Sequence, residues 1–105
     1  MEIEITKENF QQEIINSHIP VLLDFRASWC QPCAMLAPVL TQVAEKYEGK
    51  IKVCKVNIDN EIAITMEYNI TSVPTLVIIA QGEEKARTVG LMSFDELEEF
   101  ILSNS

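Results

Sequence analysis

Two cysteines three positions apart are the residues of this chain best suited to chemistry. Cys30 and Cys33 stand in the segment Trp29-Cys30-Gln31-Pro32-Cys33, where an apolar run ends and a helical pattern begins. Side chains three apart on one helical face have Cβ atoms about 5–6 Å from each other, a spacing that a small adjustment closes to disulfide distance. The pair can therefore exist as a dithiol or as a disulfide.

The predicted helix N-terminus gives the two sulfurs different roles. Unpaired backbone N–H groups and the positive end of the helix dipole favour a thiolate over a thiol at that position. Cys30 comes first and is expected to point outward from the terminus, so we predict that it is the attacking nucleophile. Cys33 lies a turn deeper and less accessible, which suits it to resolve the mixed disulfide that Cys30 forms.

A structural zinc site is the alternative interpretation of two cysteines at this spacing. Such a site needs four ligands, and the only further candidates are Cys54 and His18, which show no paired ligand spacing. Attachment of c-type haem needs a histidine directly after the second cysteine, where Ala34 stands. Cys54 itself is interpreted as a small buried apolar residue, with regulatory oxidation as the minor alternative.

The elements that must position this pair follow from the spacing of apolar residues. The run at 21–25 after Pro20 predicts a strand buried on both faces, and the long pattern after Cys33 predicts a helix that ends at Gly49 and is kinked at Pro38. The order βαβαβαββα indicates a layered α/β domain with helices on both faces of a central sheet. Further strands are predicted at 51–58, 75–80 and 85–89, and the last two are expected to form a hairpin. Further helices are predicted at 10–15 after a Thr6 cap and at 62–66 after an Asp59 or Asn60 cap. A last helix is predicted at 94–101 after a capping box in Ser93-Phe94-Asp95-Glu96.

Composition narrows the class of protein. The chain has 105 residues, 48% of them hydrophobic, and 8 basic against 16 acidic residues give a net charge of −8. This length and hydrophobic fraction predict one folded domain over residues 1–105, and the acidic balance makes nucleic acid and anionic membranes unsuitable partners. Three cysteines are too few for a disulfide-stapled secreted scaffold, and the acidic, alternating segment Met1-Glu2-Ile3-Glu4-Ile5 has no leader pattern. We therefore expect a soluble cytoplasmic protein.

The sequence resembles the thioredoxin family over nearly its whole length. The resemblance implies a thioredoxin fold, with a central five-stranded mixed sheet flanked by four helices, and dithiol–disulfide exchange as the activity. Electrons would come from a flavoprotein thioredoxin reductase and pass to disulfide-containing protein substrates, with no metal or bound cofactor, and we expect a monomer. The matching motifs are Asp24-Phe25, Trp29-Cys30, Pro32-Cys33, Pro38, Lys55-Val56-Asn57-Ile58-Asp59, Val73-Pro74-Thr75, Gly82 and Gly90.

The resemblance assigns roles to an acid and a base near the cysteines. From the residues alone, Asp24 fits a water-facing strand residue as well as a buried one. In the family the matching acid is buried beneath the resolving cysteine and acts as a proton relay, and burial would raise its pKa into a useful range. Lys55 matches a lysine that neighbours this acid, although a solvated charge on a strand is its alternative interpretation.

The resemblance also implies a docking surface for protein substrates. Only about 5–6% of X-Pro bonds in folded proteins are cis, yet the family implies a cis bond between Val73 and Pro74 that faces the disulfide. The backbone of Val73 would then hydrogen-bond an extended substrate segment. The apolar surface around it would consist of Trp29, Pro32, Val73, Pro74, Gly90 and Leu91.

Three positions depart from the family pattern. Gln31 replaces the usual glycine between the cysteines, Ala34 stands where a basic residue is common, and Arg26 occupies the position of a common tryptophan. Arg26 could support the Cys30 thiolate, pair with Asp24 or Asp59, or simply lie along the surface. We predict a protein-disulfide reductase, and a redox-inactive interaction module on the same fold is the alternative.

Overall fold

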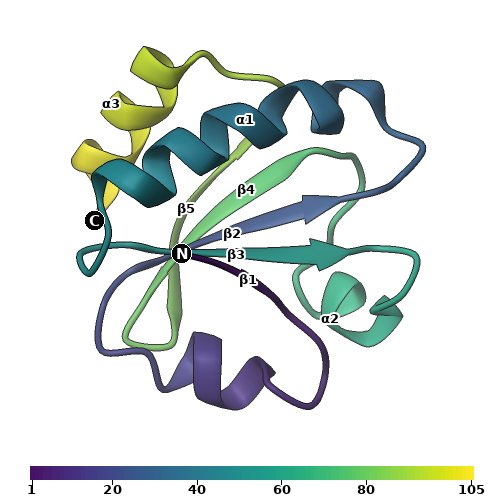
Figure 1. Ribbon diagram of the computed structural model, residues 1–105. Coiled ribbons are helices and arrows are strands. Elements are labelled where there is room, and N and C mark those ends of the chain that lie inside the picture. The colour runs from purple at the N-terminus through teal and green to yellow at the C-terminus, as the bar shows by residue number, and fades with distance from the viewer.

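The computed structural model describes residues 1–105 as five strands and four helices around one central sheet (Figure 1). The order along the chain is the predicted βαβαβαββα. No helix in the chain is both long and apolar enough to cross a membrane. The elements are β1 (Glu2–Glu4), a π-helix η1 (Gln11–Ile15), β2 (Val21–Arg26), α1 (Gln31–Lys46), β3 (Lys52–Asn57), α2 (Ile62–Glu67), β4 (Thr75–Ala80), β5 (Glu83–Val89) and α3 (Phe94–Asn104).

The sheet has the strand order β1-β3-β2-β4-β5, which places β2 at its centre. β3 runs parallel to both β1 and β2, whereas β4 is antiparallel to β2 and to β5. The predicted mixed sheet is therefore confirmed. β4 and β5 form the predicted hairpin, whose two-residue turn has positive φ at Gln81 (55°) and Gly82 (79°), the backbone that a tight hairpin favours.

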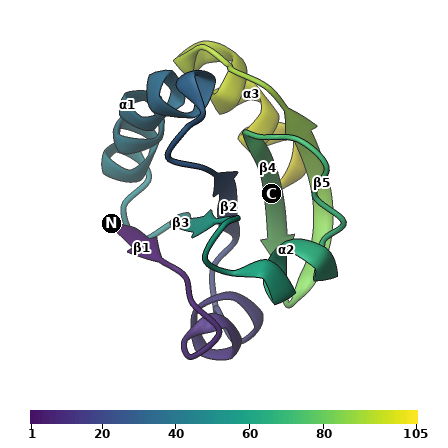
Figure 2. The same cartoon turned by 90° about the vertical axis from the view of Figure 1, so that its right-hand side faces the viewer.

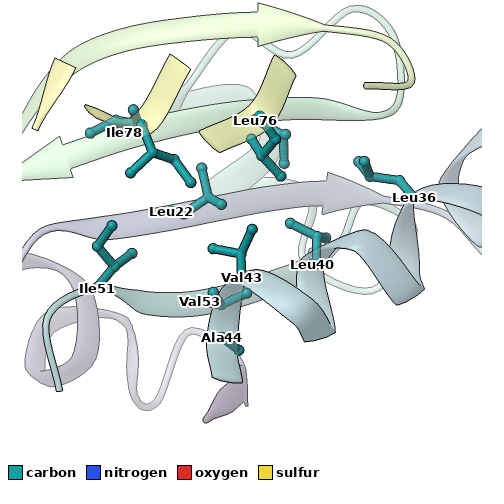
Figure 3. Close-up of a cluster of buried hydrophobic side chains, with 11 residues drawn as sticks. Leu22, Leu36, Leu40, Val43, Ala44, Ile51, Val53, Leu76 and Ile78 are labelled. Atoms are coloured by element: carbon teal, nitrogen blue, oxygen red, sulfur yellow. The ribbon is translucent and has the colours of Figure 1, made fainter. Parts of the chain in front are cut away.

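Helices cover both faces of the sheet (Figure 2). α1 and α3 lie together on one face, and η1 and α2 lie on the other. Each face has its own apolar cluster. Leu22 packs under α1 and α3 (Figure 3), and Leu23 packs under η1 and α2. Because side chains alternate along a strand, Asp24 must point to the same face as Leu22, toward α1.

Two of the predicted helix caps are wrong. The side chain of Thr6 caps no helix, because η1 begins at Gln11 without a side-chain cap; only the backbone N–H of Thr6 is bonded locally, to Asn9 Oδ1. Neither Asp59 nor Asn60 caps α2, which starts after Glu61 without a side-chain cap. By contrast, the capping box of α3 is confirmed: Ser93 Oγ accepts from the Glu96 N–H, and Glu96 Oε1 accepts from the Ser93 N–H.

The long helix continues through Pro38, which lies inside α1. A proline there removes one backbone donor without ending the helix, and the kink expected at this point stays a prediction. Gly49 follows the helix with a φ of 81°, as its predicted role as a stop requires. The result is one uninterrupted helix that carries the cysteine pair at its first turn.

Candidate redox site

The cysteine pair lies at the junction between β2 and α1. Cys30 is the N-cap residue of α1, and its Sγ accepts a hydrogen bond of 3.1 Å from the backbone N–H of Cys33. The two residues form a disulfide, with their Cα atoms 5.2 Å apart. Pro32 lies in the first turn, where a missing N–H leaves no intrahelical bond unmade. The local sequence therefore places a sulfur where a helix normally has an oxygen cap.

Exposure does not separate the two sulfurs as the sequence suggested. Cys30 is 6% exposed and Cys33 is 5% exposed, so the expectation that Cys33 is clearly less accessible is wrong for the disulfide form. The difference between them is the hydrogen bond, because the Cys33 N–H points at the sulfur of Cys30. A negative charge is thus better stabilised on Cys30 than on Cys33.

Asp24 is buried, with 2% of its surface exposed. It lies in register with Lys55 on β3 and Leu76 on β4, and no protein group donates a hydrogen bond to its Oδ1. Burial raises the pKa of the Asp24 carboxyl from its ordinary 3.8 to about 7, against the opposing pull of Lys55 and Arg26. The water-facing alternative is therefore wrong, and the carboxyl can change protonation near neutral pH.

The two basic residues nearest Asp24 are paired elsewhere. Lys55 Nζ lies 2.9 Å from Glu2 Oε1, and its side chain is 19% exposed, so it is not a fully solvated charge. One guanidinium nitrogen of Arg26 lies 3.2 Å from Glu4 Oε1. The pairing of Arg26 with Asp24 or Asp59 was a wrong prediction, because strand β1 brings Glu4 within reach.

A pocket of about 210 Å³ lies beside the disulfide and is lined by both basic residues. Arg26 and Lys55 line it from the sheet, and Cys30, Cys33 and Ala37 line it from the loop and α1. Asp24 points to the same face of the sheet as its register neighbour Lys55 and as Arg26 two residues further along β2, so its carboxyl faces the same region under the first turns of α1. The acid, the two cations and the cysteines therefore belong to one site.

The predicted docking surface is assembled around the disulfide. The Val73-Pro74 bond is cis, and Val73 packs against Cys30 and Cys33. The Gly90 N–H donates to the Pro74 carbonyl at 2.9 Å, which brings the segment after β5 alongside. Trp29 and Leu91 are 68% and 45% exposed, and Gln31 and Pro32 are exposed as well. Pro74, in contrast, is buried, so its predicted place in the exposed apolar surface is wrong.

Cys54 lies in the apolar cluster under η1 and α2, away from the cysteine pair. It is fully buried, and burial raises the pKa of its thiol to about 12. A thiol of that kind is a poor nucleophile, and its place on the other face of the sheet prevents it from joining Cys30 and Cys33 around a zinc ion.

The roles of three carboxylates at the site, Glu2, Glu4 and Asp59, do not follow from the sequence reasoning. Glu2 and Glu4 hold the cations beside Asp24, and the alternating acids of the N-terminal segment were the signal that pointed to them. Asp59 was considered only as a cap or as a partner of Arg26. In the structure its Oδ2 accepts from the Trp29 indole N–H at 2.9 Å, which fixes the exposed ring.

Comparison with known proteins agrees with this site. The family model described as Thioredoxin matches residues 1–103. The chain belongs to the thioredoxin family. It is similar to proteins named thioredoxin from Rickettsia bellii (40% identical over 104 residues, 99% of each chain) and from Porphyra purpurea (45% over 95 residues, 90% of this chain and 89% of the other). Another from Pseudomonas aeruginosa is 40% identical over 102 residues, 97% of this chain and 94% of the other.

Thioredoxins are protein-disulfide oxidoreductases, and the Cys30–Cys33 disulfide lies at the motif that carries this chemistry. The chain is thus a thiol–disulfide oxidoreductase. The thioredoxin fold expected from the sequence is confirmed.

The buried carboxyl predicts a characteristic dependence of stability on pH. Between pH 3.8 and about 7 the folded protein keeps a proton on Asp24 that the unfolded chain has lost, so the free energy of unfolding must fall as pH rises through this range. Asp24→Asn should abolish this slope and stabilise the oxidised protein at pH 8 by up to about 4 kcal/mol. Urea unfolding at pH 5 to 8 measures both effects.

The control for this experiment is Glu45→Gln, which removes an exposed carboxylate from α1. It should leave the slope unchanged. Parallel pH dependence in the wild type and in Asp24→Asn would contradict the assignment of the slope to Asp24.

Proposed function

We propose that the protein reduces protein disulfides, with Cys30 as the attacking nucleophile and Cys33 as the resolving thiol. The observation that carries this assignment is the hydrogen bond from the Cys33 N–H to the Cys30 sulfur at the N-cap of α1. A donor directed at one sulfur stabilises negative charge on that sulfur, and the thiolate is the reactive form.

The reaction has two exchange steps. In the first, the Cys30 thiolate attacks one sulfur of the substrate disulfide, a mixed disulfide forms, and the other substrate sulfur leaves as a thiolate that takes up a proton. In the second, Cys33 loses its proton and attacks the Cys30 sulfur, which releases the second substrate thiolate and leaves the Cys30–Cys33 disulfide. Two electrons have then passed from the protein to the substrate.

Asp24 is the proposed base for the second step. Its carboxyl faces the region under the first turns of α1, and a pKa of about 7 allows it to accept the Cys33 proton near neutral pH. Lys55 and Arg26 lie beside it and favour its charged form, so we assign them a supporting role.

Protein substrates are proposed to dock on the surface around the disulfide. The exposed Trp29, Pro32 and Leu91 offer apolar contact, and the backbone of Val73 would hydrogen-bond an extended segment of the substrate. Gly90 lacks a side chain beside this segment, and Gln31 adds an amide next to the sulfur. A small apolar patch on an acidic protein suits a protein partner.

The oxidised protein must be returned to the dithiol to act again. We propose that a flavoprotein thioredoxin reductase supplies the two electrons, so that the chain carries electrons between two proteins without a metal or bound cofactor. The cytoplasm suits such a carrier, because thiols are kept reduced in that compartment. The protein is proposed to act there as a monomer.

Trapping of the mixed disulfide tests the two cysteine roles. Cys33→Ser removes the resolving thiol, so a protein disulfide should accumulate as a covalent adduct on Cys30 that dithiothreitol releases. Non-reducing gel electrophoresis and mass spectrometry of the adduct measure this. The matched control, Cys33→Ser with Cys54→Ser, should trap the same adduct.

Adducts through Cys54 would contradict the assignment. Failure of Cys33→Ser to form adducts, together with a wild-type protein that does not reduce insulin disulfides, would instead support the interaction module without turnover.

The direction of electron flow is tested by equilibration with glutathione buffers. A protein-disulfide reductant should have a dithiol potential below the about −200 to −230 mV of glutaredoxins. Quantifying the thiol and disulfide forms of Cys30 and Cys33 at equilibrium gives the value. A potential near about −180 mV, the range of disulfide isomerases, would contradict the proposed direction.

A further inference from the structure

Two ion pairs connect the edge strand β1 to the cations of the redox site. Glu2 and Glu4 both lie on β1, and they are two residues apart, so their side chains point to the same face of the sheet. Lys55 reaches Glu2 from the neighbouring strand β3. Arg26 reaches Glu4 from β2, which is separated from β1 by β3, so its side chain must cross that strand.

Both cations are thereby drawn toward the edge of the sheet. Lys55 is the register neighbour of Asp24, and Arg26 lies two residues further along the same strand and face. Neither forms an ion pair with Asp24, whose Oδ1 has no hydrogen-bond donor. The Nε atom of Arg26 is also buried and unpaired, so this guanidinium is held by Glu4 alone.

We propose that Glu2 and Glu4 are positioning residues of the redox site, which hold Lys55 and Arg26 away from the Asp24 carboxyl and so keep that carboxyl able to bind a proton near neutral pH. Neither carboxylate lines the pocket beside the disulfide, so both act through the cations. The inference rests on the proposed role of Asp24 as the base for Cys33.

The charged groups that face Asp24 come from three strands, and the start of α1 supplies the uncharged disulfide. β1 supplies Glu2 and Glu4, β3 supplies Lys55, β2 supplies Arg26, and α1 supplies the cysteine pair; the register neighbour on β4 is the apolar Leu76. Around the buried acid the two cations lower the pKa of Asp24 more than the two carboxylates raise it. Burial then dominates, and it raises the pKa of Asp24 while the two cations oppose it.

Removal of either Glu2 or Glu4 has two effects, and both lower the pKa of Asp24. The negative charge that opposes ionisation of Asp24 is lost, and the released cation becomes free to approach the carboxyl. Glu2→Gln and Glu4→Gln should therefore each lower the titration midpoint of Asp24 by on the order of half a pH unit. Arg26→Gln should raise the midpoint, because it removes a cation and leaves Glu4.

The experiment is a pH titration of the Asp24 carboxyl carbon by NMR in the oxidised protein and its variants. Glu83→Gln is the matched control, because Glu83 pairs with Lys85 on β5, the opposite edge strand, and the change in net charge is the same. This control should leave the midpoint where it is in the wild type. The inference is overturned if Glu2→Gln and Glu4→Gln leave the midpoint unchanged.

The role of Asp24 in catalysis is measured separately, by the rate at which the mixed disulfide on Cys30 is resolved. If Asp24→Asn slows this step and the midpoint still fails to move in the glutamate variants, only the inference about β1 is wrong. If the midpoint moves as expected and Asp24→Asn resolves at the wild-type rate, the positioning of the cations is supported and the proposed base is wrong.

Discussion

One hydrogen bond, from the backbone N–H of Cys33 to the sulfur of Cys30, connects the fold to the chemistry. It exists because α1 begins at the end of the central strand β2, with a cysteine at the N-cap position. The same helix start brings the two cysteines to disulfide distance and directs a backbone donor at only one of them. The rest of the domain holds this junction in place: β2 lies between β3 and β4, and α1 packs on the sheet through Leu36, Leu40 and Val43 (Figure 3).

The buried carboxyl of Asp24 is the second constraint, and its burial lowers the stability of the folded protein. A carboxyl inside an apolar layer without a hydrogen-bond donor disfavours the charged form, which raises its pKa to about 7. The core tolerates this group because Val21, Leu22, Leu23 and Phe25 on the same strand are apolar and fully buried and stabilise the folded state. The unfavourable burial gives the site a group that can exchange a proton at neutral pH, which is the property that the proposed mechanism requires of the base for Cys33.

Much of this arrangement could be predicted from the sequence, and the predictions that were wrong have physical reasons. The strand at β2, the helix after Cys33 and the capping box at Ser93 follow from strong local patterns. Burial of Asp24 could not be read locally, because β2 is covered on both faces and shows no polar alternation. The partner of Arg26 depends on the sheet order, which brings Glu4 near it from 22 residues away. The two predicted caps are wrong because the helices begin later than the local sequence indicates, η1 at Gln11 and α2 after Glu61.

The claim that helix position, rather than exposure, assigns the cysteine roles is tested most directly by alkylation. The fully reduced protein would be treated with iodoacetamide at pH 7, and each cysteine would be followed by mass spectrometry. The account predicts that Cys30 is modified first, that Cys33 follows slowly, and that the buried Cys54 reacts only after unfolding. Modification of Cys33 before Cys30, or of both at the same rate, would contradict it.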